Sequence, residues 1–320
     1  MSRRLRLAAA TLLLAAGSAA AQDYPKGPVK LIVPYPAGGT TDIYSRVLAA
    51  GMQQKFGQPF VVENVPGAAT AIGAERVAKA APDGHTLIMV TVTTMSMNPL
   101  TLKDLRYKPS DLAPVALTLR QPFVLVASLN FPPNNVRELI AYAKANPGKI
   151  NWATQGIAGS SHLVGELLQG LAGIQFFAVH YKGSAPANTD LFAGRADLHF
   201  DGSGTSLANI NSKRVKGIAH TGDKRVPGAP DVPTFVESGL PGMQVWSWYG
   251  IATTAGTPQP VIQKLNTEMN AFMKSREVQE RMAKDGSEAG DMTPEQFSRM
   301  IAEETELWRK VLAPLNLKLD

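Results

Sequence analysis

The sequence predicts an α/β protein in which mainly parallel strands alternate with helices. Short runs rich in β-branched residues recur along the chain, and stretches with helical periodicity separate them. The composition is 44% hydrophobic and 18% charged over 320 residues, with no low-complexity tract, which is typical of a globular chain. This alternation indicates βαβ units with helices on both faces of a sheet.

The predicted strands share β-branched or aromatic residues and have turn-forming residues at their ends. They are 29–33, 60–63, 86–92, 123–127, 150–153, 176–180, 197–200, 215–219 and 246–252. The helices predicted between them are 42–55, 69–80, 136–145, 162–171, 187–193 and 207–211.

The C-terminal third changes character and predicts a helical tail. The segments "TPQPVIQKLNTEMNAFM" and "TPEQFSRMIAEETELWRKVL" each begin with Thr and then Pro, an N-cap followed by a first helical residue. In the second segment Gln296 lies three positions after Thr293, which is the spacing of a capping box.

Residues 1–21 have the features of an export signal. Three arginines precede the apolar stretch 7–16, and a small-residue cleavage site follows at 19–21. That apolar stretch is shorter than the roughly 20 residues that span a bilayer. We expect the mature protein to begin near Gln22; the alternative is a retained N-terminal anchor.

Charge and cysteine content narrow the classes of protein. Removing the signal lowers the net charge from +6 to about +3, and the remaining Lys and Arg residues are scattered, so a nucleic-acid partner is not expected. The chain has no Cys, which excludes disulfides and a lipid anchor at the cleavage site. We therefore expect a monomer that is free in the periplasm.

Two stretches have the composition of crossings between domains. They are "LRQPFVLV" at 119–126 and "KRVPGAPDVPTF" at 224–235. If the chain leaves the first domain at one and returns at the other, domain 1 comprises 22–122 plus 225–320, and domain 2 is the insertion 123–224. Two such crossings would form a hinge.

The turn after the first strand, "YPAGGTTD", resembles an anion site. Its glycines allow a ligand to approach the backbone, and the N–H groups at the start of the next helix favour negative charge. The candidates are Tyr35, Ala37, Gly38, Gly39 and Thr40. The alternative is that the glycines only form a tight βα turn. Asp42 and Arg46, four residues apart, are expected to cap and brace the helix.

Further polar turns follow other predicted strands. In open α/β sheets such turns meet in one crevice, where they bind ligand. The candidate residues in them are Thr93, Thr94, Thr154, Gly159, Ser160, Ser161, His162, Tyr181, Gly183, Ser184, Ala185 and Asp201. Lys182 is expected to be solvated, and for Asp201 a turn-forming role is favoured over contact with the ligand. Tyr35, Trp152, Phe177 and Tyr181 either line a pocket for an aromatic acid or, as we favour, pack in the core and hinge.

Motifs for catalysis, nucleotides and metals are absent from the sequence. It contains no GxSxG, GxGxxG or GxxxxGK[ST], and its five histidines lack the spacing of paired metal ligands. Ser161 and His162 are neighbours on a predicted helix and point apart, so they cannot act as nucleophile and base. We expect no catalytic residue, no metal and no cofactor.

Four stretches give the chain a specific resemblance. These are "YPAGGTTDIYSR", "VENVPGAATAIGAERVAKAAPDGHTL", "YKGSAPANTDLFAGRADLHFD" and "VPTFVESGLPGMQVWSWYGIATTAGTP". They resemble the Bug-type periplasmic receptors of tripartite tricarboxylate transporters, in order, from about residue 24 to the C-terminus.

The resemblance implies a two-domain periplasmic-binding-protein clamshell that binds a small di-, tri- or aromatic carboxylate, partly through ordered water. It also implies delivery of that ligand to the membrane permease subunits. In that family the turns matching 35–40, 154–162 and 181–185 hold the ligand. Gln155, Ile157 and His180 depart from the usual pattern, which leaves the identity of the carboxylate open. The alternative is a periplasmic sensor subunit that docks on a signalling protein.

Overall fold

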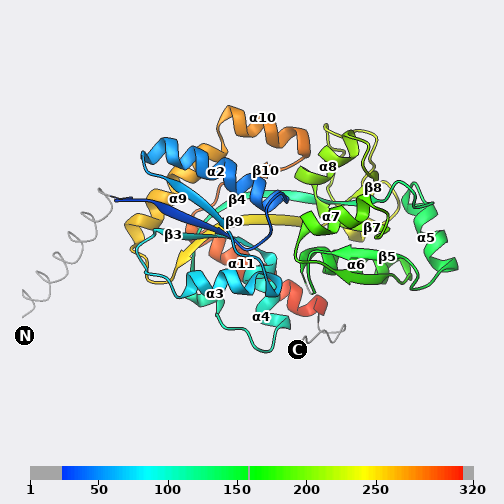
Figure 1. Ribbon diagram of the computed structural model, residues 1–320, viewed down its shortest axis with the longest axis horizontal. Helices are drawn as coiled ribbons and strands as arrows, with labels where there is room; N and C mark the ends of the chain where they lie inside the picture. Colours follow the sequence, from blue (N-terminus) through cyan, green and yellow to red (C-terminus); the bar gives the residue numbers. More distant parts are fainter. Residues whose placement is uncertain (1–23, 158, 313–320) are drawn as a thin grey trace, which may run out of the picture.

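One long strand, β4 (Leu112–Ala127), runs through the middle of the structure (Figure 1). The computed structural model describes residues 24–157 and 159–312, so the predicted export signal lies outside the described residues. The strands are ordered β2-β1-β3-β9-β4-β7-β5-β6, and β8 and β10 also pair with β4. The predicted α/β class is therefore confirmed.

The blue, orange and red segments of Figure 1 gather on one side of the molecule. Their strands are β1 (Val29–Val33), β2 (Phe60–Asn64), β3 (Thr86–Thr91), β9 (Trp246–Thr254) and β10 (Glu288–Ala289). Strands β1, β2 and β3 are parallel, whereas β9 is antiparallel to both β3 and β4. The helices are α2 (Thr40–Phe56), α3 (Ala71–Ala78), α4 (Asn98–Thr101), α9 (Gln259–Met273), α10 (Arg276–Asp285) and α11 (Pro294–Leu312).

The green segments form the other side (Figure 1). Strands β5 (Asn151–Thr154), β6 (Phe177–His180) and β7 (Leu198–Gly202) are parallel, and β8 (Lys216–His220) is antiparallel to β4. The helices are α5 (Val136–Ala145), α6 (Ser160–Ala172), α7 (Ser184–Phe192) and α8 (Ser203–Asn211). Short helical turns elsewhere are η1 (Ala68–Thr70), η2 (Thr93–Met97), η3 (Pro109–Asp111) and η4 (Pro241–Met243).

Most predicted elements are confirmed, with small shifts at their ends. Strand β1 has the predicted bounds, and so does α5. The capping box of α11 is formed, because Thr293 N donates to Gln296 Oε1 at 2.9 Å and Gln296 N to Thr293 Oγ1 at 3.3 Å. Among the described residues, no helix has the length and apolar character needed to cross a membrane.

Strand β4 is much longer than the predicted 123–127. Pro114 and Pro122 made its first part a poor strand candidate, since proline donates no backbone hydrogen bond. The pairing register with β9 shifts between Pro114 and Ala116, and this bulge accommodates the proline within the sheet.

The pairing partners of β4 change at one point along its length. Leu112 to Pro122 pair with β9, whereas Phe123 to Ala127 pair with β7 and β8. The side chains of Val226, Phe235 and Met243 pack into the cores around β7 and β8. The division into two domains stays a prediction, and this packing favours a return crossing near Trp246 rather than at 225.

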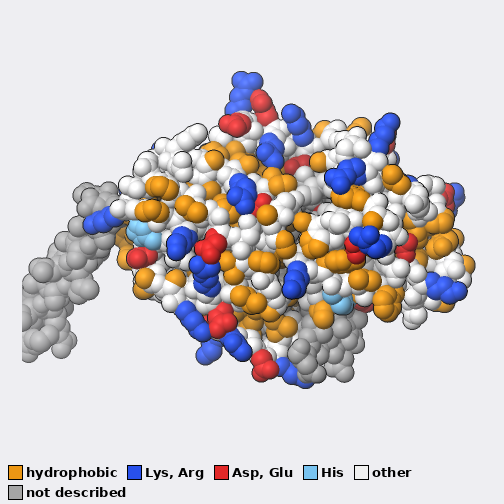
Figure 2. All heavy atoms as spheres, in the orientation of Figure 1, with side chains coloured by type: hydrophobic (Ala, Val, Ile, Leu, Met, Phe, Trp, Pro, Cys, Tyr) orange, Lys and Arg blue, Asp and Glu red, His pale blue; other side chains and the backbone are white. Residues whose placement is uncertain are grey.

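Charged side chains on the face shown in Figure 2 are scattered over both sides of the molecule. Lys and Arg residues lie singly or beside Asp and Glu, and on this face they form no continuous stripe.

Candidate functional site

The turns that follow β1, β6 and β7 meet at the middle of the molecule. A Cβ atom placed on Gly39 would lie 3.4 Å from Ser184 Cβ, and one on Gly183 would lie 2.8 Å from Pro36 Cδ. Thr40 Oγ1 and Thr205 Oγ1 are 3.0 Å apart and share a hydrogen bond. The predicted turns from the two sides of the molecule are therefore in direct contact.

The space left between these turns is small. One cavity of about 70 Å³ is lined by residues that include Tyr35, Thr70, Gln155 and Tyr181. A second, of about 10 Å³, is lined by Tyr35, Pro36, Gly39, Thr40, Thr41, Gln155, Ser184, Asp201 and Tyr249. The second holds one water molecule at most. The two sides are thus in contact, and the space between their turns is small in this structure.

The β1–α2 turn is held by Asp42, as predicted. Its carboxylate accepts hydrogen bonds from Gly38 N at 3.0 Å and Arg46 Nε at 3.1 Å, and from Asn64 Nδ2 at 2.9 Å. Burial acts to raise the pKa of Asp42, but these hydrogen bonds outweigh it and the pKa is lowered. The Gly38 N–H is bound to Asp42 and is not available to a ligand. The N–H groups of the first turn of α2 have no acceptor within the helix, so they are the donors that this turn can offer.

The two glycines of this turn differ in conformation. Gly38 has a φ of +90°, which L-residues rarely adopt, whereas Gly39 has a φ of −85°. The backbone therefore favours glycine at position 38, whereas at position 39 a Cβ would be in close contact with Ser184.

Asp201, at the end of β7, joins three of the turns. Its side chain is 1% exposed. It accepts hydrogen bonds from Gln155 Nε2 at 2.9 Å, Gly202 N at 2.8 Å, Asn188 Nδ2 at 2.9 Å and Thr205 Oγ1 at 2.7 Å, and from Ser184 Oγ. Sequence reasoning favoured a simple turn-former, but the carboxylate instead orders the β5–α6 turn and the starts of α7 and α8.

The β5–α6 turn is ordered by its own hydroxyl groups. Ser161 Oγ accepts a hydrogen bond from Gln155 N at 2.8 Å, and Thr154 Oγ1 lies 2.8 Å from His180 Nδ1. Gly159 is the N-cap of α6, and Ser160 N donates to Thr93 Oγ1 at 3.3 Å. The last contact joins the two sides of the molecule through predicted site residues.

Several predicted residues lie behind the cavities. Thr94 Oγ1 donates to Thr70 Oγ1 at 3.0 Å. The ring of His162 packs on Trp152 at 5.3 Å, and its Nε2 lies 3.5 Å from Glu166 Oε1. Any effect of Thr94 or His162 on a ligand would therefore be indirect.

The aromatic candidates separate into three groups. Tyr35 and Tyr181 line the larger cavity, and the Tyr181 hydroxyl donates to Asp190 Oδ2 at 2.6 Å. Trp152 is buried in the core, whereas Phe177 is 59% exposed on β6. Lys182 is exposed beside the larger cavity, and Ala185 lies next to Gly38.

Sequence reasoning missed several polar residues near the cavities, including Thr41 and Thr70 in their lining. Asn188 and Thr205 bind Asp201, Tyr249 lines the smaller cavity, and Gln121 Nε2 donates to the Tyr249 hydroxyl at 2.8 Å. Burial raises the pKa of Tyr249, so this phenol stays protonated. Gln121 lies between Arg120 and Pro122 in the predicted crossing 119–126, and no local pattern identifies it as a site residue.

The described residues contain no group of three or more Cys, His, Asp or Glu side chains that could hold a metal ion. The candidate site instead consists of hydroxyl groups, amides and helix N-termini, ordered by the carboxylates of Asp42 and Asp201.

Two histidines, the exposed His180 at the end of β6 and the buried His220, predict how stability depends on pH. Partial burial lowers the pKa of His180, as does the nearby His162, and burial also lowers the pKa of His220. Below an unfolded pKa of about 6.5 the unfolded chain then binds more protons than the folded one, so stability is lost as the pH falls. We expect a lower free energy of unfolding at pH 5.5 than at pH 7.5 in urea titrations.

Replacing His180 and His220 by glutamine should flatten this dependence. Equal stability of the parent at the two pH values would contradict the prediction.

A two-sided α/β fold with polar turns meeting between the sides defines a solute-binding protein of the periplasmic type. The family model described as the Tripartite tricarboxylate transporter family receptor, TctC, matches residues 44–317. The chain belongs to this family, which confirms the resemblance to Bug-type receptors. It is a periplasmic solute-binding receptor and not an enzyme.

Individual relatives agree with this assignment. Protein BugT of Bordetella pertussis is 33% identical over 306 residues, covering 95% of this chain and 94% of BugT. The solved structure of periplasmic binding protein BugD matches with a TM-score of 0.87 at 36% identity, covering 92% of this chain and 99% of that chain.

Two further solved structures carry ligands. R. palustris Rpa4515 with adipate matches with a TM-score of 0.88 at 34% identity, covering 91% of this chain and 97% of that chain. MatC from Rhodopseudomonas palustris with bound malate matches with a TM-score of 0.85 at 32% identity, covering 90% of this chain and all of that chain.

Proposed function

We propose that this receptor captures a small di-, tri- or aromatic carboxylate between its two sides and delivers it to the permease subunits of a tripartite tricarboxylate transporter. The observation that carries the proposal is the meeting of the N-termini of α2 and α7 at a cavity lined by hydroxyl groups. Helix N-termini favour anions and need no Lys or Arg to do so. The adipate and malate found in two similar receptors support this ligand class.

The proposed ligand site is the set of turn residues predicted from the sequence, with Asp201 ordering the donors and with Thr94 and His162 acting only indirectly. The Ser184 hydroxyl donates a hydrogen bond to Asp201, and the Ser161 hydroxyl accepts one from Gln155 N. Since Ser161 Oγ accepts from Gln155, its own proton can be donated to a ligand oxygen.

The proposal includes the mature form of the protein. The export signal is removed near Gln22, and the mature chain works as a monomer without a lipid anchor. Its two domains are 22–122 plus 225–320 and the insertion 123–224, with the packing of 226–243 favouring a later return crossing. Ligand closes them about the crossing strands.

Identification of the ligand tests this function. Mass spectrometry of freshly purified protein should detect a released carboxylic acid, and a thermal-shift panel of mono-, di- and tricarboxylates should single out the same acid. At 100 times its dissociation constant a true ligand stabilises the protein by about 2.7 kcal/mol. The neutral amides of the same acids are the control, and equal stabilisation by acid and amide would contradict carboxylate recognition.

Side-chain replacements should rank the donors. Ser161→Ala removes a buried hydroxyl, and we expect it to weaken carboxylate binding about tenfold to a hundredfold. Lys182→Ala should cost less, because Lys182 is exposed. Calorimetric titration measures both, with Ser212→Ala at an exposed serine as the control. If Lys182→Ala lost binding and Ser161→Ala did not, the predicted order of the two donors would be wrong.

A further inference from the structure

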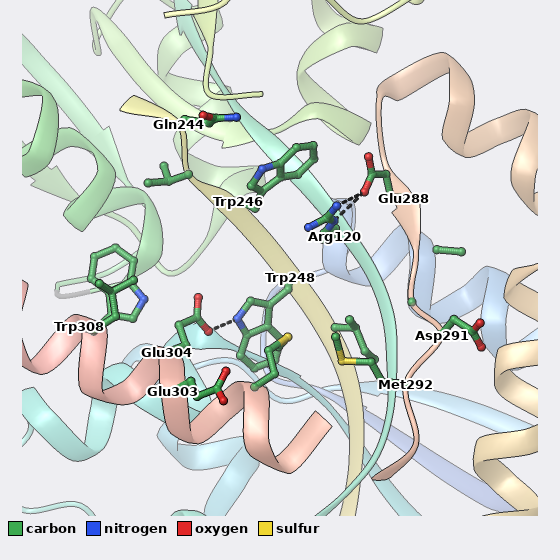
Figure 3. A pocket seen from close by; sticks show the side chains of 16 residues that line it. Arg120, Gln244, Trp246, Trp248, Glu288, Asp291, Met292, Glu303, Glu304 and Trp308 are labelled. Carbon is green, nitrogen blue, oxygen red and sulfur yellow. Dashed lines mark hydrogen bonds and ion pairs between the residues drawn. The ribbon is translucent and has the colours of Figure 1, made fainter. Parts of the chain in front are cut away.

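A groove of about 720 Å³ lies away from the cavities described above, between β4, β9, β10 and α11 (Figure 3). Its volume falls within the range of roughly 300–1,000 Å³ that is typical of small-molecule sites. None of the proposed carboxylate-binding residues lines it.

The wall of the groove is aromatic and apolar. Three of the four tryptophans of the chain, Trp246, Trp248 and Trp308, line it. Met292 and Met300 complete this wall, together with Leu307, which is 58% exposed on α11. Figure 3 shows the three indoles around one space, with carboxylates between them.

The charge of the groove is negative. Glu288, Asp291, Glu303 and Glu304 line it, and Arg120 is the one Lys or Arg among the described lining residues. Arg120 is already bound to Glu288, with Arg120 Nε 2.6 Å from Glu288 Oε2. Asp291 pairs with Lys274 at 2.5 Å. Neither Glu303 nor Glu304 is therefore paired with a cation that lines the groove. Burial raises the pKa of Glu304, so the exposed Glu303 is the main source of negative charge at this wall.

Glu304 is held among the indoles. Its Oε2 accepts a hydrogen bond from Trp248 Nε1, shown as a dashed line in Figure 3. The guanidinium of Arg120 lies 4.9 Å from the centre of the Trp246 ring, so one indole of this wall already contacts a cation. An indole face beside a carboxylate is the environment that attracts alkylammonium groups.

We propose that this groove is a second ligand site, which binds a small organic cation of the alkylammonium or quaternary ammonium class. The apolar body of such a cation would contact the tryptophan and methionine side chains, and its charge would face Glu303 and Glu304. A carboxylate is repelled by the same wall. The groove thus favours a cation, whereas the site between the turns is proposed to bind an anion. The two sites act independently of each other.

Choline and its neutral isostere 3,3-dimethyl-1-butanol provide the test. The two differ in the charged nitrogen, so their difference in affinity isolates the charge. Tryptophan fluorescence is the readout, since three of the four tryptophans line the groove. We expect choline to bind about twofold to thirtyfold more tightly than the alcohol. Absence of choline binding, or equal binding of the alcohol, would overturn the proposal.

Matched variants locate the binding. Glu303→Gln and Glu304→Gln should each weaken choline binding, whereas Glu306→Gln should not, because Glu306 lies on the same helix, pairs with Arg309 and does not line the groove. If Glu304→Gln fails to fold, the exposed Glu303 still provides the test. An equal loss in Glu306→Gln would overturn the proposal. The carboxylate thermal shift should be unchanged in all three variants, which separates failure of this proposal from failure of the proposed function.

Discussion

Gly39→Val is expected to abolish carboxylate binding almost completely. A Cβ at this position would lie 3.4 Å from Ser184 Cβ, and the two γ carbons of valine would add bulk at this contact between the two sides. The two sides could then not close, and the donors that they contribute together would be lost. Because each hydrogen bond to a charged ligand contributes about 1.5–3 kcal/mol, we expect more than about a hundredfold loss of affinity.

Calorimetric titration with the identified carboxylate measures this loss. Gly27→Val is the control, since nothing lies within 4 Å of a Cβ at Gly27. The backbone itself should tolerate valine at position 39, because the φ of −85° is an ordinary value. A folded Gly39→Val protein with parental affinity would show that the turn does not contact the ligand.

The second large effect is expected for Asp201→Ala, and it concerns stability. The replacement would leave the donors of Gln155, Ser184, Asn188 and Thr205 without their buried acceptor. We expect the free energy of unfolding to fall by on the order of 3 kcal/mol or more, since each unsatisfied buried donor costs about 1–3 kcal/mol. Urea denaturation measures the change.

Asp231→Ala, at an exposed aspartate, is the matched control and should change stability by no more than about 0.5 kcal/mol. Asp201→Asn should have an intermediate effect. The amide keeps one acceptor oxygen, but its NH2 group replaces the other oxygen and places a donor against the donors of the hydroxyl groups. An Asp201→Ala protein as stable as the parent would mean that the donors find water as an equivalent acceptor.

The sequence was informative wherever local chemistry determines structure. The Thr293-Pro294 pair predicted the start of α11, and the Asp42–Arg46 spacing predicted the brace of α2, because capping and i,i+4 pairing depend on neighbouring residues. Helix α9 was predicted, but its cap was wrong, since Pro258 and not Thr257 is the N-cap. Helix α10 was missed because its residues are mostly polar, with Val278 and Met282 as its buried positions.

Long-range contacts account for most of what could not be predicted in the site. Asp201 is 46 residues from Gln155 and 17 from Ser184 in sequence, and no local pattern indicates that they share hydrogen bonds. The conformations of Gly38 and Gly39 likewise depend on the tertiary fold. A Gly-Gly pair in a sequence does not show which of the two glycines has the positive φ. The acidic aromatic groove joins residues from 117 to 308, and each of them alone is unremarkable in the sequence.

Strand β4 has a consequence for cooperativity. Its first part belongs to the sheet of β9 and its last part to the sheet of β7 and β8, within one uninterrupted strand. If either side of the molecule unfolds, the other side therefore loses β4 as a paired strand of its sheet. The two sides can separate by bending of β4 and of the neighbouring crossing. We expect them to unfold in a single cooperative transition.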